Sequence, residues 1–310
     1  MKVLPYSAAD KPRWDSFVRN SRNGTLLFER SYMDYHAERF KDASLLIEDE
    51  GRLLALLPAS RHGDSLRSHG GLTYGGFITD AQMRVEKMLS VFATTCNALR
   101  AAGIRQLEYK AIPHIYHRQP TEEDLYALFR HGAHLLKREP SAAIELAGLH
   151  LPSMKRYGAR QALKLGLRCT QATDASELMA LIDSNLRARH GVAAVHTAAE
   201  MQQLHANFPQ HIELLEVRDA TGVLHGGAVV YLAGPVAHTQ YLASSDSGRR
   251  SSLMELLECE LAERYRNRCR WLEFGISSEN GGQTLNAGLM RHKEKFGARC
   301  VCYDTYLLDL

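Results

Sequence analysis

Two glutamates lie in short apolar segments, where a charged side chain is unexpected. Glu273 follows Leu272, and Glu108 follows Leu107. If these segments are strands covered on both faces, each carboxylate is costly to bury unless it is paired or protonated. Such a carboxylate is a candidate general base, or a ligand for a substrate ammonium group. The alternative is a carboxylate paired with a structural arginine.

A candidate anion site precedes the helix that we predict around Leu253. It consists of Ser247, Gly248, Arg249 and Arg250. Free N–H groups at a helix start, with two arginines beside them, suit an anion such as a phosphate. An ordinary helix cap by Ser247 or Ser251 explains the serines equally well.

A second basic feature is a set of cations that recur every four residues. Arg156, Arg160, Lys164 and Arg168 would form one stripe if their segment is helical. Through charge-assisted hydrogen bonds the stripe could hold a nucleotide diphosphate or the backbone of a tRNA. The alternative is a solvated face of an ordinary surface helix.

Aromatic, histidine and lysine side chains gather around the end of the strand predicted over residues 104–110. Lys110, His114 and Tyr116 lie at or just past its carboxyl end, where ligands bind in open α/β sheets. His69 and Tyr74, in a glycine-rich stretch, are expected to face the same cleft. We therefore take these five residues as candidate acceptor contacts, with partly exposed loop residues as the alternative.

No pattern in the sequence predicts covalent or metal catalysis. The chain has no G-x-S-x-G segment, and its six cysteines form no CxxC pair. None of the histidines has metal-ligand spacing, so we expect no metal and no tightly bound cofactor. Cys300 and Cys302 are two apart, which places both on one face of a strand. Reduced, structural thiols are the simplest interpretation.

Composition indicates an ordinary globular protein. Hydrophobic residues make up 45% and charged residues 24% of the 310 residues. The net charge of +3 is too small to argue nucleic-acid or membrane binding by itself. The sequence has no signal-peptide pattern, and no segment approaches the ~18 apolar residues of a membrane span. These features predict a cytoplasmic protein without a transmembrane segment.

The elements that must position the two glutamates occur in the same order twice. In the first half we expect strands 44–48 and 52–59, helix 85–99, strand 104–110, helix 125–136 and strand 142–146. In the second half we expect strands 212–217, 224–232 and 236–243, a helix around Leu253, strand 270–275, helix 283–295 and strand 299–308. Glu108 and Glu273 therefore occupy corresponding strands.

A repeat this long indicates two similar domains rather than a solenoid. We place the joint near residues 148–152, which divides the chain into domains 1–148 and 149–310. The predicted class is mixed α/β, with a mixed antiparallel and parallel sheet flanked by helices in each domain. Strands that flank a crossover helix should pair in parallel.

The order of elements and two short motifs resemble a known family. The stretch L-N-A-G-L at 285–289, followed by Lys293 and by F-G at 296–297, is similar to the "G-L-x-x-x-K-x-x-F" helix of FemAB-like proteins. The stretch E-Y-K-A-I-P at 108–113 resembles the end of the central strand in their first domain. The resemblance covers essentially the whole chain and implies tandem GNAT-like acyltransferase domains.

The resemblance also implies roles for particular residues. Lys293 matches the lysine that would hold the carbonyl oxyanion, and Asn286 lies on the same helix face. Glu273, as a base or as a ligand for the substrate ammonium group, completes the candidate catalytic set. The loop of residues 247–250 lies where a GNAT protein cradles the pyrophosphate of coenzyme A. The alternative for Lys293 is a solvated lysine in a basic last turn of its helix.

The function that the resemblance implies is amide formation. An acyl or aminoacyl group would move from acyl-CoA or aminoacyl-tRNA to the amino group of a small-molecule or nucleotide-linked acceptor, such as a cell-envelope precursor. Glu108 and the stripe of Arg156, Arg160 and Lys164 would join the acceptor contacts, and the stripe favours the tRNA donor slightly. The alternatives are an acyl-CoA-dependent aminosugar N-acyltransferase and a catalytically degenerate pair that acts as a binding module.

Overall fold

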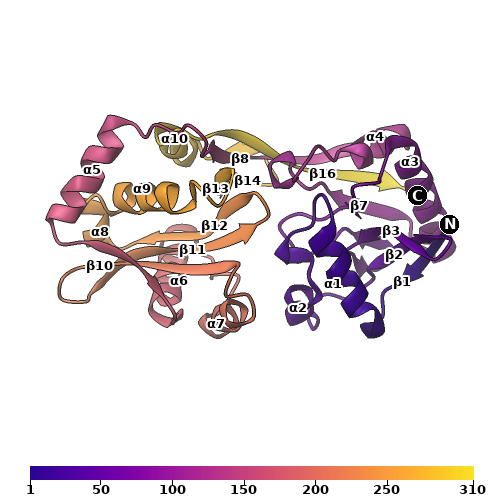
Figure 1. The fold of residues 1–310 in the computed structure, drawn as a ribbon, viewed down its shortest axis with the longest axis horizontal. Coiled ribbons are helices and arrows are strands. Elements are labelled where there is room, and N and C mark those ends of the chain that lie inside the picture. Colours follow the sequence, from indigo (N-terminus) through magenta and orange to yellow (C-terminus); the bar gives the residue numbers. More distant parts are fainter. The chain divides into compact units, whose positions relative to one another are not determined.

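The computed structural model describes residues 1–310, apart from the side chains of His36 and His190. It has the mixed α/β class that the sequence predicts. The chain forms two compact units (Figure 1). Unit 1 comprises residues 1–140, 278–285 and 301–310, and unit 2 comprises residues 141–277 and 286–300.

Unit 1 contains a small antiparallel sheet formed mainly by the first third of the chain. Its strands, in spatial order, are β1 (Lys2–Pro5), β2 (Leu45–Asp49), β3 (Arg52–Leu57) and β6 (Ile78–Thr79). The β2–β3 hairpin turns at Glu50 and Gly51, whose φ angles are 50° and 78°. Positive φ at both central residues is typical of a tight hairpin, which confirms the hairpin predicted at this position.

The strand that carries Glu108 belongs to a second group of strands in unit 1. β7 (Gln106–Lys110) runs parallel to β5 (Ser65–Arg67), which pairs with β4 (Ser60–His62). On its other side β7 pairs antiparallel with β16 (Arg299–Asp309) along Thr305–Asp309. Glu108 is thus flanked by a strand on either side, as expected for a central strand.

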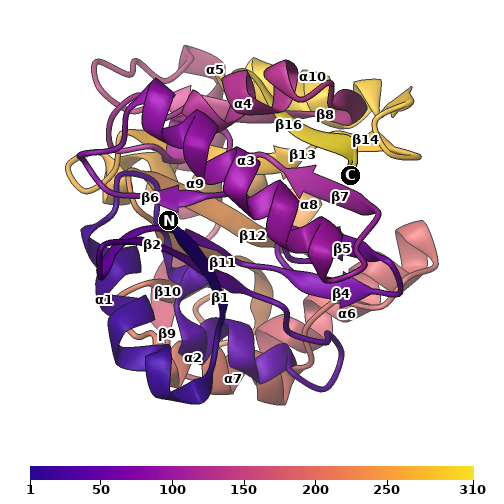
Figure 2. The same ribbon diagram turned by 90° about the vertical axis from the view of Figure 1, so that its right-hand side faces the viewer.

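Helices α3 (Val85–Ala101) and α4 (Glu123–Arg130) pack together in unit 1 (Figure 2). The predicted helix 125–136 is wrong at its end, because Gly132 adopts φ of 79° and stops it. Leu135 and Leu136 lie in β8 (His134–Glu145) instead. The other helical segments of this unit are α1 (Lys11–Asn20), α2 (Arg30–Met33) and the 3₁₀ turns Ala8–Asp10, Leu26–Phe28, Asp34–His36 and His114–Tyr116.

The strands of unit 2 lie side by side in one sheet, and the last residues of β8 are among them. The strand order after β8 is β13 (Trp271–Ile276), β12 (Val236–Ser244), β11 (Leu224–Ala233), β10 (Ile212–Arg218) and β9 (Arg168–Ala172). β12 and β13 run parallel, and the other neighbours run antiparallel. As predicted, the parallel pair flanks a crossover helix.

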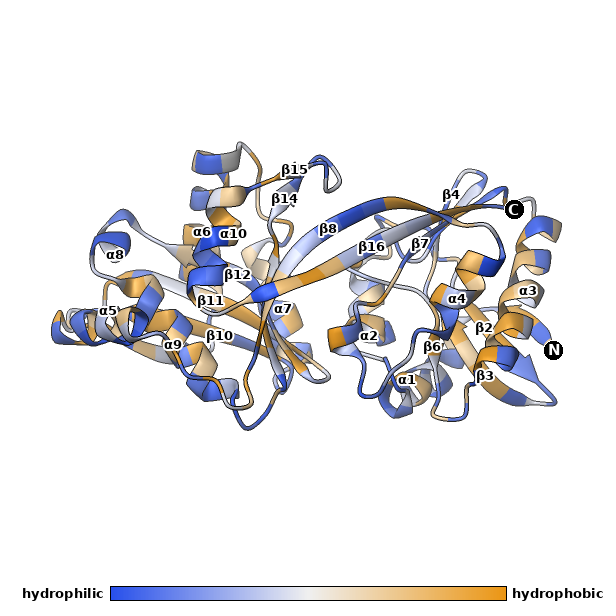
Figure 3. Cartoon of the chain, turned by 90° about the horizontal axis from the view of Figure 1, so that it is seen from above, coloured by the Kyte–Doolittle hydropathy of each residue, from blue (hydrophilic) through white to orange (hydrophobic). Residues whose placement is uncertain are grey.

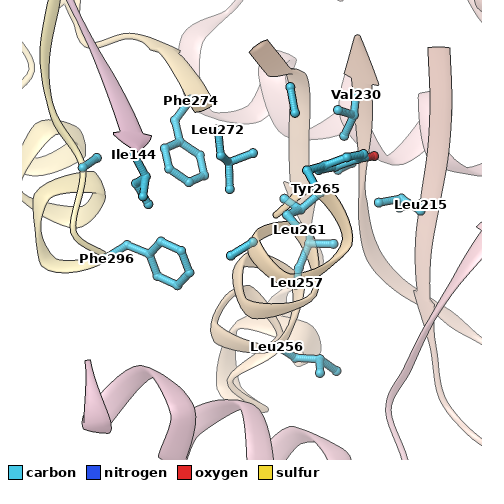
Figure 4. Close-up of a cluster of buried hydrophobic side chains, with 14 of the residues drawn as sticks. Ile144, Leu215, Val230, Leu256, Leu257, Leu261, Tyr265, Leu272, Phe274 and Phe296 are labelled. Atoms are coloured by element: carbon cyan, nitrogen blue, oxygen red, sulfur yellow. The ribbon is translucent and has the colours of Figure 1, made fainter. Parts of the chain in front are cut away.

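Helices cover both faces of the unit 2 sheet. α9 (Leu253–Tyr265) contacts β11, β12 and β13, and α6 (Ser176–His190) contacts β11 and β12 (Figure 1). Leu257, Leu261 and Tyr265 of α9 pack with Leu272 and Phe274 of β13 (Figure 4). The remaining helices of unit 2 are α5 (Ser153–Lys164), α7 (Ala198–Asn207), α8 (Asp246–Arg250) and α10 (Ala287–Lys295). The hairpin of β14 (Ser278–Glu279) and β15 (Thr284–Leu285) precedes α10 in the sequence and belongs to unit 1.

The closing strand of each half of the sequence pairs outside that half. The end of β8 pairs with β13 in unit 2, and most of β16 pairs into unit 1 beside β7. The compact units therefore differ from the predicted division into residues 1–148 and 149–310. An alternating pattern of apolar residues shows which face of a strand is buried, but it does not show which neighbouring strand the strand pairs with.

Candidate active site

The buried carboxylate of Glu273 lies at the centre of the candidate site. It is 0% exposed in β13, as predicted for a strand covered on both faces. Its partner is not the structural arginine of the alternative interpretation. Nδ1 of His238, in β12, hydrogen-bonds one carboxylate oxygen, while Ser141 Oγ and the backbone N–H of Gly275 donate to the other. The parallel register of β12 and β13 brings His238 opposite Glu273.

The electrostatic surroundings keep Glu273 ionised. Burial acts to raise the pKa of this carboxyl, but the positive charge of His238 and the hydrogen bonds from His238, Ser141 and Gly275 outweigh it. The net result is a pKa below the usual value for a glutamate. A carboxylate held in this way orients an imidazole and stabilises its protonated form, which is the arrangement required for a general base.

Lys293 lies beside this pair and is buried rather than solvated. Its side chain in α10 is 6% exposed. Nζ donates to the backbone oxygens of Gly275 (2.7 Å) and Ile276 (3.1 Å) and to Ser277 Oγ (2.9 Å). Burial lowers the pKa of Lys293 to about 8, although the negative charge of Glu273 acts to raise it. The ammonium therefore holds the turn that follows β13, and an oxyanion would have to exchange with one of these acceptors.

Asn286 has a structural role at the start of α10. Its side-chain oxygen accepts from the backbone N–H of Leu289 (3.0 Å), so it caps the helix. Met290 and Lys293 are both buried, as expected for one helix face. His292 contacts Glu258 Oε1 of α9 at 2.8 Å, which ties α10 to α9.

Unit 1 carries a corresponding pair with different chemistry. The parallel register of β5 and β7 brings Arg67 opposite Glu108, and the two form an ion pair at 2.9 Å. Lys110 Nζ donates to the backbone oxygens of His69, Gly70 and Leu72, the last at 2.8 Å. Burial lowers the pKa of Lys110 to about 8. Each unit thus has a strand glutamate and a lysine bound to loop carbonyls, but the residue opposite the glutamate is arginine in one and histidine in the other.

The structure separates the predicted acceptor residues into buried and exposed ones. Tyr74 and Tyr116 are buried with ring centroids 4.4 Å apart, and Tyr116 OH lies 2.8 Å from Tyr303 OH. His69 is buried, and its backbone oxygen accepts a hydrogen bond from Lys110 Nζ, whereas His114 is exposed. The alternative of exposed loop residues therefore fits His114 alone among these four.

The loop before α9 is held by a chain of hydrogen bonds. Ser247 Oγ lies 2.9 Å from His225 Nδ1, whose Nε2 lies 2.9 Å from Asp219 Oδ2. Ser245, not Ser247, caps the short helix α8 by accepting from the N–H of Gly248 (3.1 Å). A Cβ on Gly248 would lie 2.6 Å from the backbone oxygen of His225, so the close approach requires glycine.

Exposed cations surround the same loop. Arg249 and Arg250 are exposed in α8, and Arg249 also bonds the backbone oxygen of Ser244 and pairs with Asp246. Desolvation and the charges of Arg189 and Arg250 lower the pKa of Arg249. Arg189, at the end of α6, thus joins the predicted pair as a third cation. The cluster suits an anionic group better than any one arginine would.

Three of the four cations of the predicted stripe lie on α5, whereas Arg168 is the first residue of β9. Arg156, Arg160 and Lys164 are exposed, while Arg168 donates to the backbone oxygens of Leu163 and Leu167 at the end of the helix. Lys155, on the opposite face, is buried against Glu255 and Glu258 of α9.

Sequence reasoning missed His238, Ser141 and Arg189. The available signal for His238 was a histidine within the predicted strand 236–243, which the structure places among the buried residues Ala237, Thr239 and Tyr241. In the part of the chain described, no group of three or more His, Cys, Asp or Glu side chains is placed to hold a metal ion. Among the described helices, none has the length and apolarity needed to cross a bilayer.

A family model described as an acetyltransferase (GNAT) domain matches residues 153–293, which include His238, Glu273 and Lys293. No curated protein matches the chain in sequence. In structure the chain is similar to FemX, with a TM-score of 0.70 and 12% identity over 100% of this chain and 98% of that chain.

Two further structures are similar over nearly the full length. One is the C-terminal domain of a protein from Agrobacterium fabrum named as a lysylphosphatidylglycerol synthetase, with TM-score 0.64, 15% identity and coverage of 97% and 91%. The other is a tandem GNAT protein from the clavulanic acid biosynthesis pathway, with TM-score 0.54, 13% identity and coverage of 99% and 98%.

The match assigns residues 153–293 to the acetyltransferase (GNAT) domain class. As a whole the chain shares its fold with FemX and with the tandem GNAT protein.

Proposed function

We propose that this acyltransferase forms an amide in unit 2, with His238 as the general base and Glu273 as the residue that orients it. The observation that carries the proposal is the difference between the two units. The glutamate of unit 2 faces a histidine, whereas the glutamate of unit 1 faces Arg67. A guanidinium stays protonated at any working pH, so only the histidine pair can accept and return a proton.

The proposed reaction follows from these groups. The acceptor nitrogen loses a proton to His238 and attacks the carbonyl carbon of the donor ester or thioester. The tetrahedral intermediate then collapses, and the proton passes to the departing oxygen or sulfur. Ionised Glu273 stabilises the imidazolium between these steps. Lys293 keeps the backbone at Gly275 and Ile276 in place and is the proposed cation nearest to the developing oxyanion.

For the donor we propose aminoacyl-tRNA, held at its anionic end by Arg189, Arg249 and Arg250. The structural neighbour named as a lysylphosphatidylglycerol synthetase supports aminoacyl transfer by its name. The proposed acceptor is the amine of a cell-envelope precursor. An acyl-CoA donor is the second candidate, because the loop of residues 245–250 is held in place ahead of α9 and carries cations.

The base assignment is tested by exchanging the chemistry of the two units. His238→Arg gives unit 2 the pair that unit 1 has, and we expect turnover to fall by about 10²–10⁴, the contribution of a general base. The matched control is Arg67→His, which makes the reverse change at the corresponding position and should retain most of the turnover. Full activity of the His238→Arg variant would exclude His238 as the base.

The donor is tested by thermal protection of the wild-type protein. A ligand that binds the native state raises the Tm by mass action. We expect charged tRNA to protect and acetyl-CoA to protect less. Protection by acetyl-CoA alone would favour the aminosugar N-acyltransferase, and no response to either donor would favour a binding module.

A further inference from the structure

α5 presents an unusual surface for a helix on a globular domain. Residues 146–173, which include it, contain no Asp or Glu but five Lys or Arg residues. Three large apolar side chains in this stretch are strongly exposed: Met154 (75%), Tyr157 (57%) and Leu165 (64%). Figure 3 shows this mixture of hydrophilic and hydrophobic residues along α5. Isolated exposed apolar residues are common, but three beside a cationic stripe form a patch.

The two kinds of side chain are sorted on the exposed face. At about 100° per residue, Arg156, Arg160 and Lys164 lie along one flank of the helix. Met154 and Leu165 lie along the other flank, and Tyr157 lies between them. The opposite face packs on α9 through Gly158, Ala159 and Ala162, which are buried. The exposed face is therefore amphipathic in its own right.

The stripe is not neutralised by the fold. Lys155 forms ion pairs with the nearby carboxylates of α9, Glu255 at 3.3 Å and Glu258 at 3.5 Å. Among the residues that the structure describes, no carboxylate forms an ion pair with Arg156, Arg160 or Lys164. Because the exposed cations lack counter-ions and adjoin apolar side chains, the surface complements a partner that offers dense negative charge above an apolar layer.

We propose that the exposed face of α5 is a docking surface for an anionic phospholipid bilayer. The helix would lie in the plane of the interface, with Arg156, Arg160 and Lys164 at the lipid phosphates. Tyr157, Met154 and Leu165 would enter the boundary with the acyl chains, where their burial is favourable. An RNA backbone would satisfy the cations but would give Met154 and Leu165 no apolar surroundings, which is why we favour the bilayer.

The proposal is tested by cosedimentation of the full chain with vesicles. We expect binding to vesicles of equal parts phosphatidylcholine and phosphatidylglycerol, little binding to pure phosphatidylcholine, and loss of binding at high salt. Each cation removed should lower partitioning by about five-fold, so Arg156→Gln with Arg160→Gln should lower it roughly 30-fold. Met154→Ser with Tyr157→Ser should lower it by at least about 10-fold through lost apolar burial.

The matched control removes two exposed cations far away in the sequence, Lys2→Gln with Lys41→Gln. It makes the same change in net charge and should alter partitioning by less than about two-fold, if the local surface and not the total charge is responsible. The assay contains no acyl donor and no amine, so its outcome is independent of the proposed transfer reaction.

Three results would overturn the proposal. The first is no binding of the wild-type protein to the anionic vesicles, and the second is an equal loss of binding in the control variant. The third is binding of unfractionated tRNA that depends on Arg156 and Arg160 while vesicle binding does not, which would make α5 an RNA surface. Since the substituted side chains are exposed, circular dichroism should show an unchanged fold in every variant.

Discussion

At the scale of single residues, the identity of one neighbour decides what a buried carboxylate can do. Glu108 and Glu273 occupy equivalent strands, and each faces the residue that parallel register brings opposite it. Arg67 makes Glu108 half of a permanent ion pair, whereas His238 gives Glu273 a partner that can gain and lose a proton. The two units thus share a backbone plan and differ in reactivity.

Lys293 provides a prediction at the same scale. Lys293→Met removes the ammonium that donates hydrogen bonds to Gly275 O, Ile276 O and Ser277 Oγ. These three acceptors would then be buried without that donor. Each buried polar group left without a partner lowers the free energy of unfolding by about 1–3 kcal/mol. Part of this loss is offset because the variant no longer buries a charged ammonium group. We expect a net loss of about 2 kcal/mol in the free energy of unfolding, measured by urea denaturation.

The turnover of the Lys293→Met variant shows whether the Lys293 ammonium has a structural or a catalytic role. If Lys293 mainly holds the turn, Lys293→Arg should recover part of the lost stability, because a guanidinium can still donate to the carbonyls. Wild-type stability of Lys293→Met together with a fall of about 10²–10³ in turnover would instead assign the ammonium to the oxyanion.

At the scale of elements, a buried hydrogen bond joins β7 to α4 in unit 1. Tyr109 OH, in β7, donates to Asp124 at the start of α4 and accepts from the N–H of Phe77 (2.7 Å). Burial raises the pKa of Asp124 to about 6, although the hydrogen bond from Tyr109 acts to lower it. The tie between strand and helix is therefore sensitive to pH.

The sign of that dependence follows from the two states of the protein. The carboxyl of Asp124 ionises at its model value of 3.8 when unfolded and at about 6 when folded, so the native state holds the proton more tightly. Its contribution to stability is present below pH 4 and is lost as the pH rises through 6. We expect about 2–3 kcal/mol across this range.

The measurement compares the free energy of unfolding of the wild-type protein and the Asp124→Asn variant at several pH values. Asparagine has nearly the same shape and does not titrate, so the difference between the two proteins should change between pH 4 and 7. A constant difference would show that Asp124 titrates alike in both states. Other groups cancel because they are common to both proteins.

At the scale of the whole molecule, the six cysteines fall into two classes. Cys300 and Cys302 are exposed on one face of β16, as their spacing predicts. The other four have pKa values raised by burial to between about 11 and about 12, so few of them are thiolates near neutral pH. These four are Cys96, Cys169, Cys259 and Cys269.

We therefore expect two thiols of the native chain to react rapidly with a disulfide reagent at pH 8, and six after denaturation. The variant Cys300→Ser with Cys302→Ser should lose the rapid phase and keep the slow one, because the thiolate is the reacting species. A rapid phase that persists in this variant would contradict the burial of the other four thiols.

The sequence by itself determined most of the longer elements and their order. Periodicity located β10, β11, β12 and α9, and Gly51 marked the β2–β3 hairpin, because side-chain alternation and positive φ are local properties of the chain. It also identified Glu273 as a buried carboxylate, since a charged residue stands out in an apolar strand. Lys293 was identified by the resemblance of its helix to the FemAB-like motif. Exposure of Arg156 and Arg160 on α5 followed from the same spacing.

Only the tertiary structure decided how distant segments meet. The sequence places His238 in one strand and Glu273 in another, but their contact depends on the parallel register of β12 and β13 across a crossover helix. The pairing of β16 with β7 is likewise set by which sheet edge is open, not by the pattern within the strand. Local sequence fixes the period and the faces of an element, whereas register and partner depend on the packing of the complete chain.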